Sequence, residues 1–182
     1  MIRQPAGRGL VPSTIHRCGL SLGSNVGDRL RHLQLAAQAV GLLADYSHPV
    51  FKSAVYETEP VGCAPGTDRF LNAVMEIGFL GEPEQLLDRL RAIESALGRP
   101  ADREKNAPRT IDLDLLYADA LVVRTDTLEL PHPRLSQRRF VLQPLAEIRP
   151  SLILPGDPRA VRDRLSDLPE GEPPLHIITR EW

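Results

Sequence analysis

The sequence predicts an α+β fold with a ferredoxin-like βαββαβ core, in which an antiparallel sheet is flanked by helices as three layers, α/β/α. Two observations support this prediction. Segments with apolar residues at helical spacing alternate with short segments rich in β-branched and aromatic residues. In chain order these segments give strand, helix, strand, strand, helix and strand, which is the split βαβ arrangement.

The first strand and helix are expected near the N-terminus. Residues 15–22 (IHRCGLSL) alternate in part and end at Gly23, which favours a strand that leads into a turn. Residues 28–43 carry leucine, alanine and valine at helical spacing, which predicts a helix. Residues 1–14 are rich in proline, glycine and small polar types, so we expect a flexible arm followed by a single domain over 15–182.

Two strands are expected next. Residues 50–57 (VFKSAVYE) and 70–80 (FLNAVMEIGFL) are rich in β-branched and aromatic side chains. The segment between them contains several prolines and glycines, which predicts a stiff loop. We therefore expect two strands joined by this loop.

The second helix and the last core strand follow. Residues 82–97 place leucine and isoleucine at i, i+3 and i+4 intervals and stop at a glycine and a proline. A polar loop over 99–110 precedes 111–117 (IDLDLLY), which alternates as a strand does. Beyond the core, 140–148 and 159–165 are expected to form short helices.

The composition excludes several functional classes. A net charge of −2, from 22 basic and 24 acidic residues, argues against a nucleic-acid surface. The two cysteines lack metal-ligand spacing, which favours a reducing compartment. No leader-like or membrane-spanning apolar run is present, so we expect a cytoplasmic monomer without nucleic-acid or membrane partners.

Asp112 and Asp114 are the leading candidates for chemistry. Side chains two apart on a strand share a face, so these carboxylates project together, about 7 Å apart along the strand. Ile111, Leu113 and Leu115 then point into the core. Two hard carboxylates suit magnesium, although a pair of solvated aspartates would give the same pattern.

Cationic residues surround this pair in sequence. Arg99, Arg103, Lys105 and Arg109 lie in or beside the preceding loop, where a polyphosphate bridged by metal would need positive charge. Each alone is more commonly a solvated surface residue. The chain has no GxxxxGK[ST] motif, so any ATP site must depend on magnesium and arginine.

Motifs over roughly residues 15–155 resemble the hydroxymethyldihydropterin pyrophosphokinase family in order and spacing. They are GSNVGDRL (23–30), ETEPVG (57–62), FLNAV (70–74), IESALGR (93–99), PRTIDLDLL (108–116), LPHPR (130–134) and RRFVLQPLAEI (138–148). The pairing of PRTIDLDLL with LPHPR is far more specific than an isolated DxD.

The resemblance implies an enzyme of tetrahydrofolate biosynthesis. It would transfer diphosphate from ATP to the hydroxymethyl group of 6-hydroxymethyl-7,8-dihydropterin and release AMP. Asp112 and Asp114 match the family's ligands for two Mg²⁺ ions, and Arg99 and Arg109 match its arginines for phosphate contact and transition-state charge.

The resemblance also implies sites for both small-molecule substrates. The nucleotide would be held by Arg109 with Glu94, Leu115, His132 and Arg138. The pterin, a flat heterocycle, would stack on two aromatic rings, while an amide reads its edge and a proline-stiffened loop supplies backbone contacts. These pterin-site residues are Phe70 and Phe140, Asn72, and Thr58, Val61 and Gly62.

Departures from the family pattern gather in the loop 99–109. Ala101, Asp102 and Asn106 stand where some relatives carry basic residues and a tryptophan, and Pro133 replaces a tyrosine of some members. We expect this loop to be mobile without ligand and to close over the triphosphate with contacts of its own.

Two alternatives from other classes stay open at this point. A nucleotidyltransferase-type enzyme also combines Gly-Ser with a DxD, although usually within a short stretch, and would release pyrophosphate rather than AMP. A non-catalytic ferredoxin-like ligand-binding module would need only the alternating strand and two amphipathic helices. Measured products separate all three.

Overall fold

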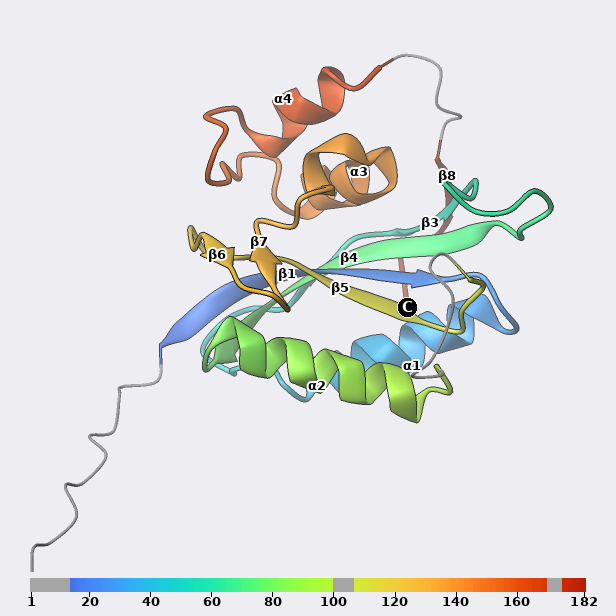
Figure 1. Cartoon of the computed structure of the whole chain (residues 1–182), viewed down its shortest axis with the longest axis horizontal. Helices are drawn as coiled ribbons and strands as arrows, with labels where there is room; N and C mark the ends of the chain where they lie inside the picture. The colour runs from blue at the N-terminus through green and yellow to red at the C-terminus, as the bar shows by residue number, and fades with distance from the viewer. Residues whose placement is uncertain (1–13, 100–106, 170–174) are drawn as a thin grey trace, which may run out of the picture.

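The computed structural model describes residues 14–99, 107–169 and 175–182, and its architecture confirms the predicted fold class (Figure 1). Most of the expected N-terminal arm and of the loop 99–109 lies outside the described residues. The elements are β1 (Ile15–Ser24), α1 (Arg29–Gly41), β2 (Phe51–Lys52), β3 (Val55–Thr58), β4 (Phe70–Leu80), α2 (Pro83–Ala96), β5 (Asp112–Ala118), β6 (Val123–Arg124), β7 (Glu129–Leu130), η1 (Leu135–Gln137), α3 (Arg139–Ile148), α4 (Val161–Ser166) and β8 (His176–Thr179).

The main sheet is antiparallel and has the order β5-β1-β4-β3-β8, with β2 also paired to β4. Strand β1 pairs with β4 from Ile15 opposite Leu80 to Ser24 opposite Leu71. Figure 1 shows α1 and α2 on one face of this sheet and α3 and α4 on the other. None of the helices in the described ranges has the length and apolar character needed to span a bilayer.

The period of two along each strand separates a fully apolar face from a mixed face. Leu20 and Leu22 of β1 and Leu113 and Leu115 of β5 join the core under α1 and α2. On the other face, Val74, Leu116 and Tyr117 pack against α3 and α4, whose own core contribution includes Val141, Leu142 and Leu145. Polar side chains occupy the rest of this second face, and some of them form the candidate site.

Local sequence determines where the two long helices begin. Asp28 precedes α1, and its side chain accepts a hydrogen bond from the backbone N–H of Arg31 at 3.0 Å. Glu82 precedes α2 and exchanges hydrogen bonds with Gln85, the reciprocal arrangement known as a capping box. Pro83 occupies the first helical position, where its missing N–H has no cost.

The expectation of one strand over 50–57 was wrong, because Ser53 and Ala54 interrupt it between β2 and β3. The Ser53 hydroxyl accepts a hydrogen bond from the N–H of Val74 at 3.0 Å, in place of a main-chain carbonyl. The N–H of Ala54 turns away from the sheet and donates to Glu147 of α3 at 3.0 Å. The sheet thereby exchanges one ladder bond for a link to the helix layer.

Three short strands were not anticipated from the sequence. β6 and β7 form a separate two-stranded sheet, and β8 adds to the main sheet beside β3. Each is too short to give a periodic signal, and β8 pairs with residues far away in the chain.

Candidate active site

Asp112 and Asp114 lie on the mixed face of β5, as the alternation predicted. Ile111, Leu113 and Leu115 are buried in the core on the opposite side. In the sheet, Asp112 stands opposite Gly23 and Asp114 opposite Ser21 of β1. Because glycine and serine are small, the strand beside the carboxylates leaves space above this part of the sheet.

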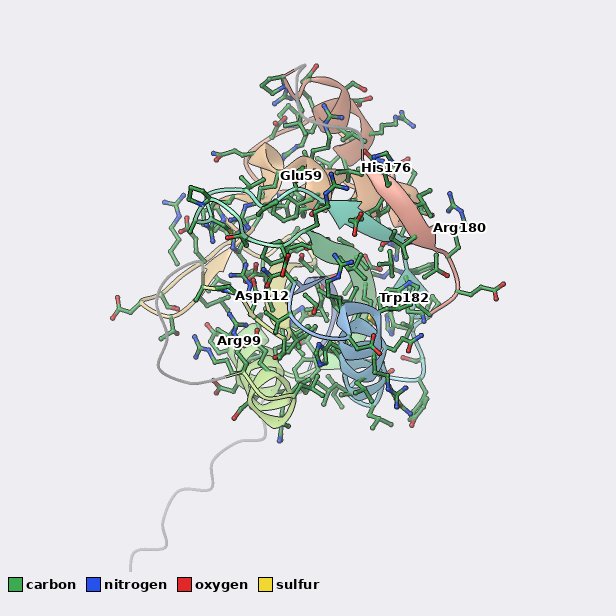
Figure 2. The ribbon with its side chains drawn as sticks, turned by 90° about the vertical axis from the view of Figure 1, so that its right-hand side faces the viewer. Glu59, Arg99, Asp112, His176, Arg180 and Trp182 are labelled. Carbon is green, nitrogen blue, oxygen red and sulfur yellow. The ribbon has the colours of Figure 1, made fainter. Side chains whose placement is uncertain are left out.

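Two arginines converge on Asp112. The Arg99 guanidinium lies 2.5 Å from Oδ1 of Asp112, and Figure 2 labels both residues in this region. The Arg109 guanidinium lies 2.9 Å from Oδ2. Only 10% of the Arg99 side chain and 18% of the Arg109 side chain is exposed, so these ion pairs are shielded from water. Each oxygen of this carboxylate therefore faces a guanidinium.

Glu94 has a structural task as well as a place at the site. It is buried near the end of α2, contacts the guanidinium of Arg99, and its Oε1 accepts the N–H of Leu113 at 2.7 Å. One carboxylate thus fixes Arg99 and the start of β5 together. The expectation that Glu94 belongs to a nucleotide pocket is compatible with this position, since it also lines a cavity.

Asn25, which sequence reasoning did not assign, holds Arg109 in place. Its side-chain oxygen accepts the N–H of Arg109 at 2.8 Å, and its own N–H donates to the Arg109 carbonyl at 3.1 Å. The Arg109 guanidinium then lies over the ring of Phe70, 5.1 Å from its centroid, as a cation–π contact. The only signal in the sequence was the position of Asn25 within the GSNVGDRL motif.

Phe70, Asn72 and Phe140 gather, with Thr58 and Val61, around a cavity of about 340 Å³. Nδ2 of Asn72 donates to Thr58 Oγ1 at 2.7 Å, which fixes the orientation of the amide. Gly23 is required here, because a Cβ at that position would lie 2.8 Å from Oδ1 of Asn72. A buried amide and two aromatic side chains in one cavity suit a flat, hydrogen-bonding heterocycle.

Other residues of this loop and of the segment 134–138 differ in whether they line the smaller cavity. Gly62 has φ +67°, which only glycine adopts easily, and it shapes the turn without lining the cavity. Arg138 lines the smaller cavity and lies over the ring of Phe140 at 5.3 Å. Arg134 and Cys63 also line it, and neither was assigned from the sequence.

A larger cavity of about 700 Å³ lies on the other side of the carboxylates. Glu94, Leu115 and His132 line it, together with the exposed face of α2 and the β6–β7 hairpin. Of the residues that the structure describes, Arg99, Asp112 and Asp114 line both cavities. The carboxylate pair therefore stands at the junction of two separate binding spaces.

Electrostatics at the junction are unbalanced. Burial, and then the neighbouring Asp112, raise the pKa of Asp114 above its ordinary value, while His132 and the arginines oppose the shift. Burial chiefly lowers the pKa of His132, and Arg138 lowers it further. Burial and the nearby Arg134 lower the pKa of Arg138. Carboxylates therefore lie beside carboxylates, and cationic groups beside cationic groups, in a largely buried place. Such crowding is typical of a functional site.

The carboxylate pair offers few protein ligands for a metal ion. Within residues 14–99, 107–169 and 175–182, no group of three or more His, Cys, Asp or Glu side chains is placed to hold a metal ion. Magnesium is commonly bound by one or two carboxylates and takes its remaining ligands from phosphates and water. The arrangement thus suits a metal that arrives with a phosphorylated ligand.

Comparisons with known proteins show the family of this chain. The family described as 7,8-dihydro-6-hydroxymethylpterin-pyrophosphokinase (HPPK) matches residues 19–150. The 2-amino-4-hydroxy-6-hydroxymethyldihydropteridine pyrophosphokinase of Bacillus subtilis is 42% identical over 71% of this chain and 75% of its own length. The Methylorubrum extorquens protein of the same name is 40% identical over 84% and 93%. A crystal structure of Plasmodium falciparum HPPK-DHPS has a TM-score of 0.67 at 12% identity, over 85% of this chain and 44% of that longer chain, which shows the fold alone.

Proposed function

The chain belongs to the 7,8-dihydro-6-hydroxymethylpterin-pyrophosphokinase family, whose members are transferases of folate biosynthesis that use ATP. We propose that each of its two cavities binds one of the two substrates. The enzyme transfers diphosphate to the hydroxymethyl group of 6-hydroxymethyl-7,8-dihydropterin and releases AMP. The smaller cavity takes the pterin and the larger one takes ATP. The observation that carries this proposal is that both cavities meet at Asp112 and Asp114.

The pterin is bound by stacking and by edge recognition. Phe70 and Phe140 supply ring faces, and the amide of Asn72, held by Thr58, presents its polar atoms to the edge of the heterocycle. Val61 and the backbone of its loop border the cavity. This binding directs the hydroxymethyl group toward the junction, where the phosphates of ATP arrive from the other side.

ATP occupies the larger cavity with its phosphates toward the carboxylates. Glu94, Leu115 and His132 border this space, and Arg138 reaches the same junction from the pterin side. The hydroxymethyl oxygen attacks the β-phosphorus and releases its proton to water, and the bond from that phosphorus to the oxygen of AMP breaks. Arg99 and Arg109, already held at the junction, offset charge on the transferring phosphates.

Asp112 and Asp114 fit a magnesium site. They are hard oxygen donors on one strand face, they repel each other, and they border the space assigned to the triphosphate. We propose that they hold two Mg²⁺ ions brought with ATP. When bound, magnesium neutralises charge that develops on the oxygen that leaves with AMP.

Product analysis tests the whole assignment. The protein is incubated with ATP, magnesium and the pterin alcohol, and AMP and pterin diphosphate are quantified together. Equal amounts of both products, abolished by EDTA, are expected. Release of pyrophosphate would instead support a nucleotidyltransferase, and binding without turnover would support a ligand-binding module.

We also propose that residues 15–182 act as a single-domain, cytoplasmic monomer. The described cysteines are both free thiols, which agrees with a reducing compartment. Sedimentation at micromolar concentration is expected to give the mass of one 20.2 kDa chain. A dimer that persists on dilution would contradict the monomer.

A further inference from the structure

The C-terminal segment 175–182 follows the outer side of β3, the strand that leads into the smaller cavity. β8 pairs with β3 in antiparallel register, with Tyr56 opposite Ile177 and Glu57 opposite His176. Figure 2 shows β8 along the edge of the sheet, with His176 and Glu59 near one end and Trp182 near the other. This segment lies outside the residues 19–150 that the family matches.

Trp182 ties the end of this segment to the start of β3. Its indole N–H donates to the carbonyl of Ser53 at 2.8 Å, and its ring packs against the apolar core under α1 and α2. The ammonium of Lys52 contacts the main-chain oxygen of Trp182 and lies 4.8 Å from the indole centroid. Trp182 thus contacts Lys52 and Ser53, at the interruption between β2 and β3.

Arg180 adds a second tether through α3. Its guanidinium pairs with Oε1 of Glu147, and Oε2 of the same carboxylate accepts the N–H of Ala54 and the hydroxyl of Tyr56, both at 3.0 Å. Glu147 therefore joins three chain segments at one point. Residues 52–57 are held by β8, by Trp182 and by α3 at once.

β3 ends at Thr58, which lines the smaller cavity, so the strand that these tethers hold leads directly to that cavity. Thr58 accepts the hydrogen bond that orients the Asn72 amide, and Val61 and Cys63 of the following loop line the same cavity. Among the residues that the structure describes, the lining of the larger cavity comes from α2, Arg99, β5 and residues 125–133, and none of it comes from β2, β3 or β8. The tethers therefore bear on one cavity and not on the other.

We propose that the segment 175–182, through Arg180 and Trp182, positions β3 and the Thr58–Asn72 pair, and so sets affinity for the pterin without affecting ATP. The inference rests on the proposed function of the smaller cavity. Arg180 and Trp182 are positioning residues, because they act through Glu147 and Ser53 and are not among the described residues that line the two substrate cavities.

The test uses the full chain with both tethers removed, Arg180→Ala with Trp182→Ala. We expect the KM for the pterin alcohol, and the Kd for it by calorimetry, to rise about tenfold, as loss of two well-made polar contacts allows. The KM for ATP is expected to stay within about twofold. Equal rises in both constants, or unchanged constants with a lower melting temperature, would show a merely structural role and overturn the proposal.

Milder and matched variants keep the test decisive if the double variant does not fold. Trp182→Phe removes the indole N–H but keeps an aromatic ring, although a smaller one, and Arg180→Lys is expected to restore pterin affinity relative to Arg180→Ala. Arg162→Ala is the control, because that α4 side chain is 63% exposed, like Arg180. Unchanged pterin affinity in both Trp182→Phe and Arg180→Ala overturns the proposal. If the wild type itself neither binds nor converts the pterin, the proposed function fails, which is a different result.

Discussion

Two sets of acidic side chains, Glu76 and the pair Asp112 and Asp114, lie on the same face of the sheet and have different surroundings. Glu76 of β4 is 3% exposed, accepts the Tyr117 hydroxyl at 2.6 Å, and binds Arg149 through both oxygens. Asp112 and Asp114 stand next to each other at the junction of two cavities, and their mutual repulsion is part of what raises the pKa of Asp114. Glu76 is enclosed among its partners, whereas Asp112 and Asp114 border two cavities, with Asp112 paired to Arg99 and Arg109.

The difference indicates what each set is for. Burial and the hydrogen bond to Glu76 raise the pKa of Tyr117, so its hydroxyl stays a donor at any physiological pH. The Glu76 hydrogen bonds likewise raise the pKa of Arg149. A buried charge with all of its partners supports the fold, whereas repelling carboxylates are retained where a ligand or metal relieves them. Substitutions should therefore separate stability from activity along this face.

The largest effect is expected at the crowded set. Asp112→Ala or Asp114→Ala should lower magnesium-dependent turnover about a thousandfold, roughly 4 kcal/mol of transition-state stabilisation, while the circular dichroism spectrum is retained. Asp163→Ala in α4, where 55% of the side chain is exposed, serves as control. Activity close to wild type in either site variant would remove the metal assignment.

At the enclosed set the effect should fall on stability. Glu76→Gln leaves Arg149 and Tyr117 without their charged acceptor, so the free energy of unfolding in urea is expected to drop by about 3 kcal/mol. Turnover per folded molecule should stay unchanged. A loss of turnover comparable with that of Asp114→Ala would erase the distinction between the two sets.

A smaller change of the same set sharpens the comparison. Tyr117→Phe removes one donor to Glu76 and should lower the free energy of unfolding by about 1.5 kcal/mol, with no effect on either KM. A double-mutant cycle with Glu76→Gln measures the coupling. Additive effects would mean that the hydroxyl and the carboxylate do not act as one network.

The two cysteines also differ in burial, and their labelling is expected to give the smallest effect. Cys18 is buried, and burial raises its pKa to about 12 from 9.0, whereas Cys63 lines the smaller cavity. Iodoacetamide at pH 8 should modify Cys63 and spare Cys18, and bound pterin should slow the reaction. Between pH 9 and 12 the unfolded thiol of Cys18 ionises before the folded one, so stability should fall as pH rises. Equal labelling of both thiols in the folded protein would contradict this description.

Much of the fold was predictable because it depends on local periodicity. The helical spacing of leucines gave α1 and α2, and the alternation around IDLDLLY correctly placed Asp112 and Asp114 on one face and Leu113 and Leu115 on the other. The interruption at Ser53 could not be predicted, because it depends on Val74 and Glu147, both remote in the chain.

The sequence by itself determined the order of elements, the two faces of each strand and the motif set that marks the family. Only the tertiary structure decided that Asn25 holds Arg109, that Arg99 and Arg109 share Asp112, and that two cavities meet at the carboxylates. Tertiary structure also placed the C-terminal strand beside β3. The physical reason is range: periodicity and capping act over a few neighbouring residues, while strand pairing and ion pairs join groups whose separation in sequence carries no local signal.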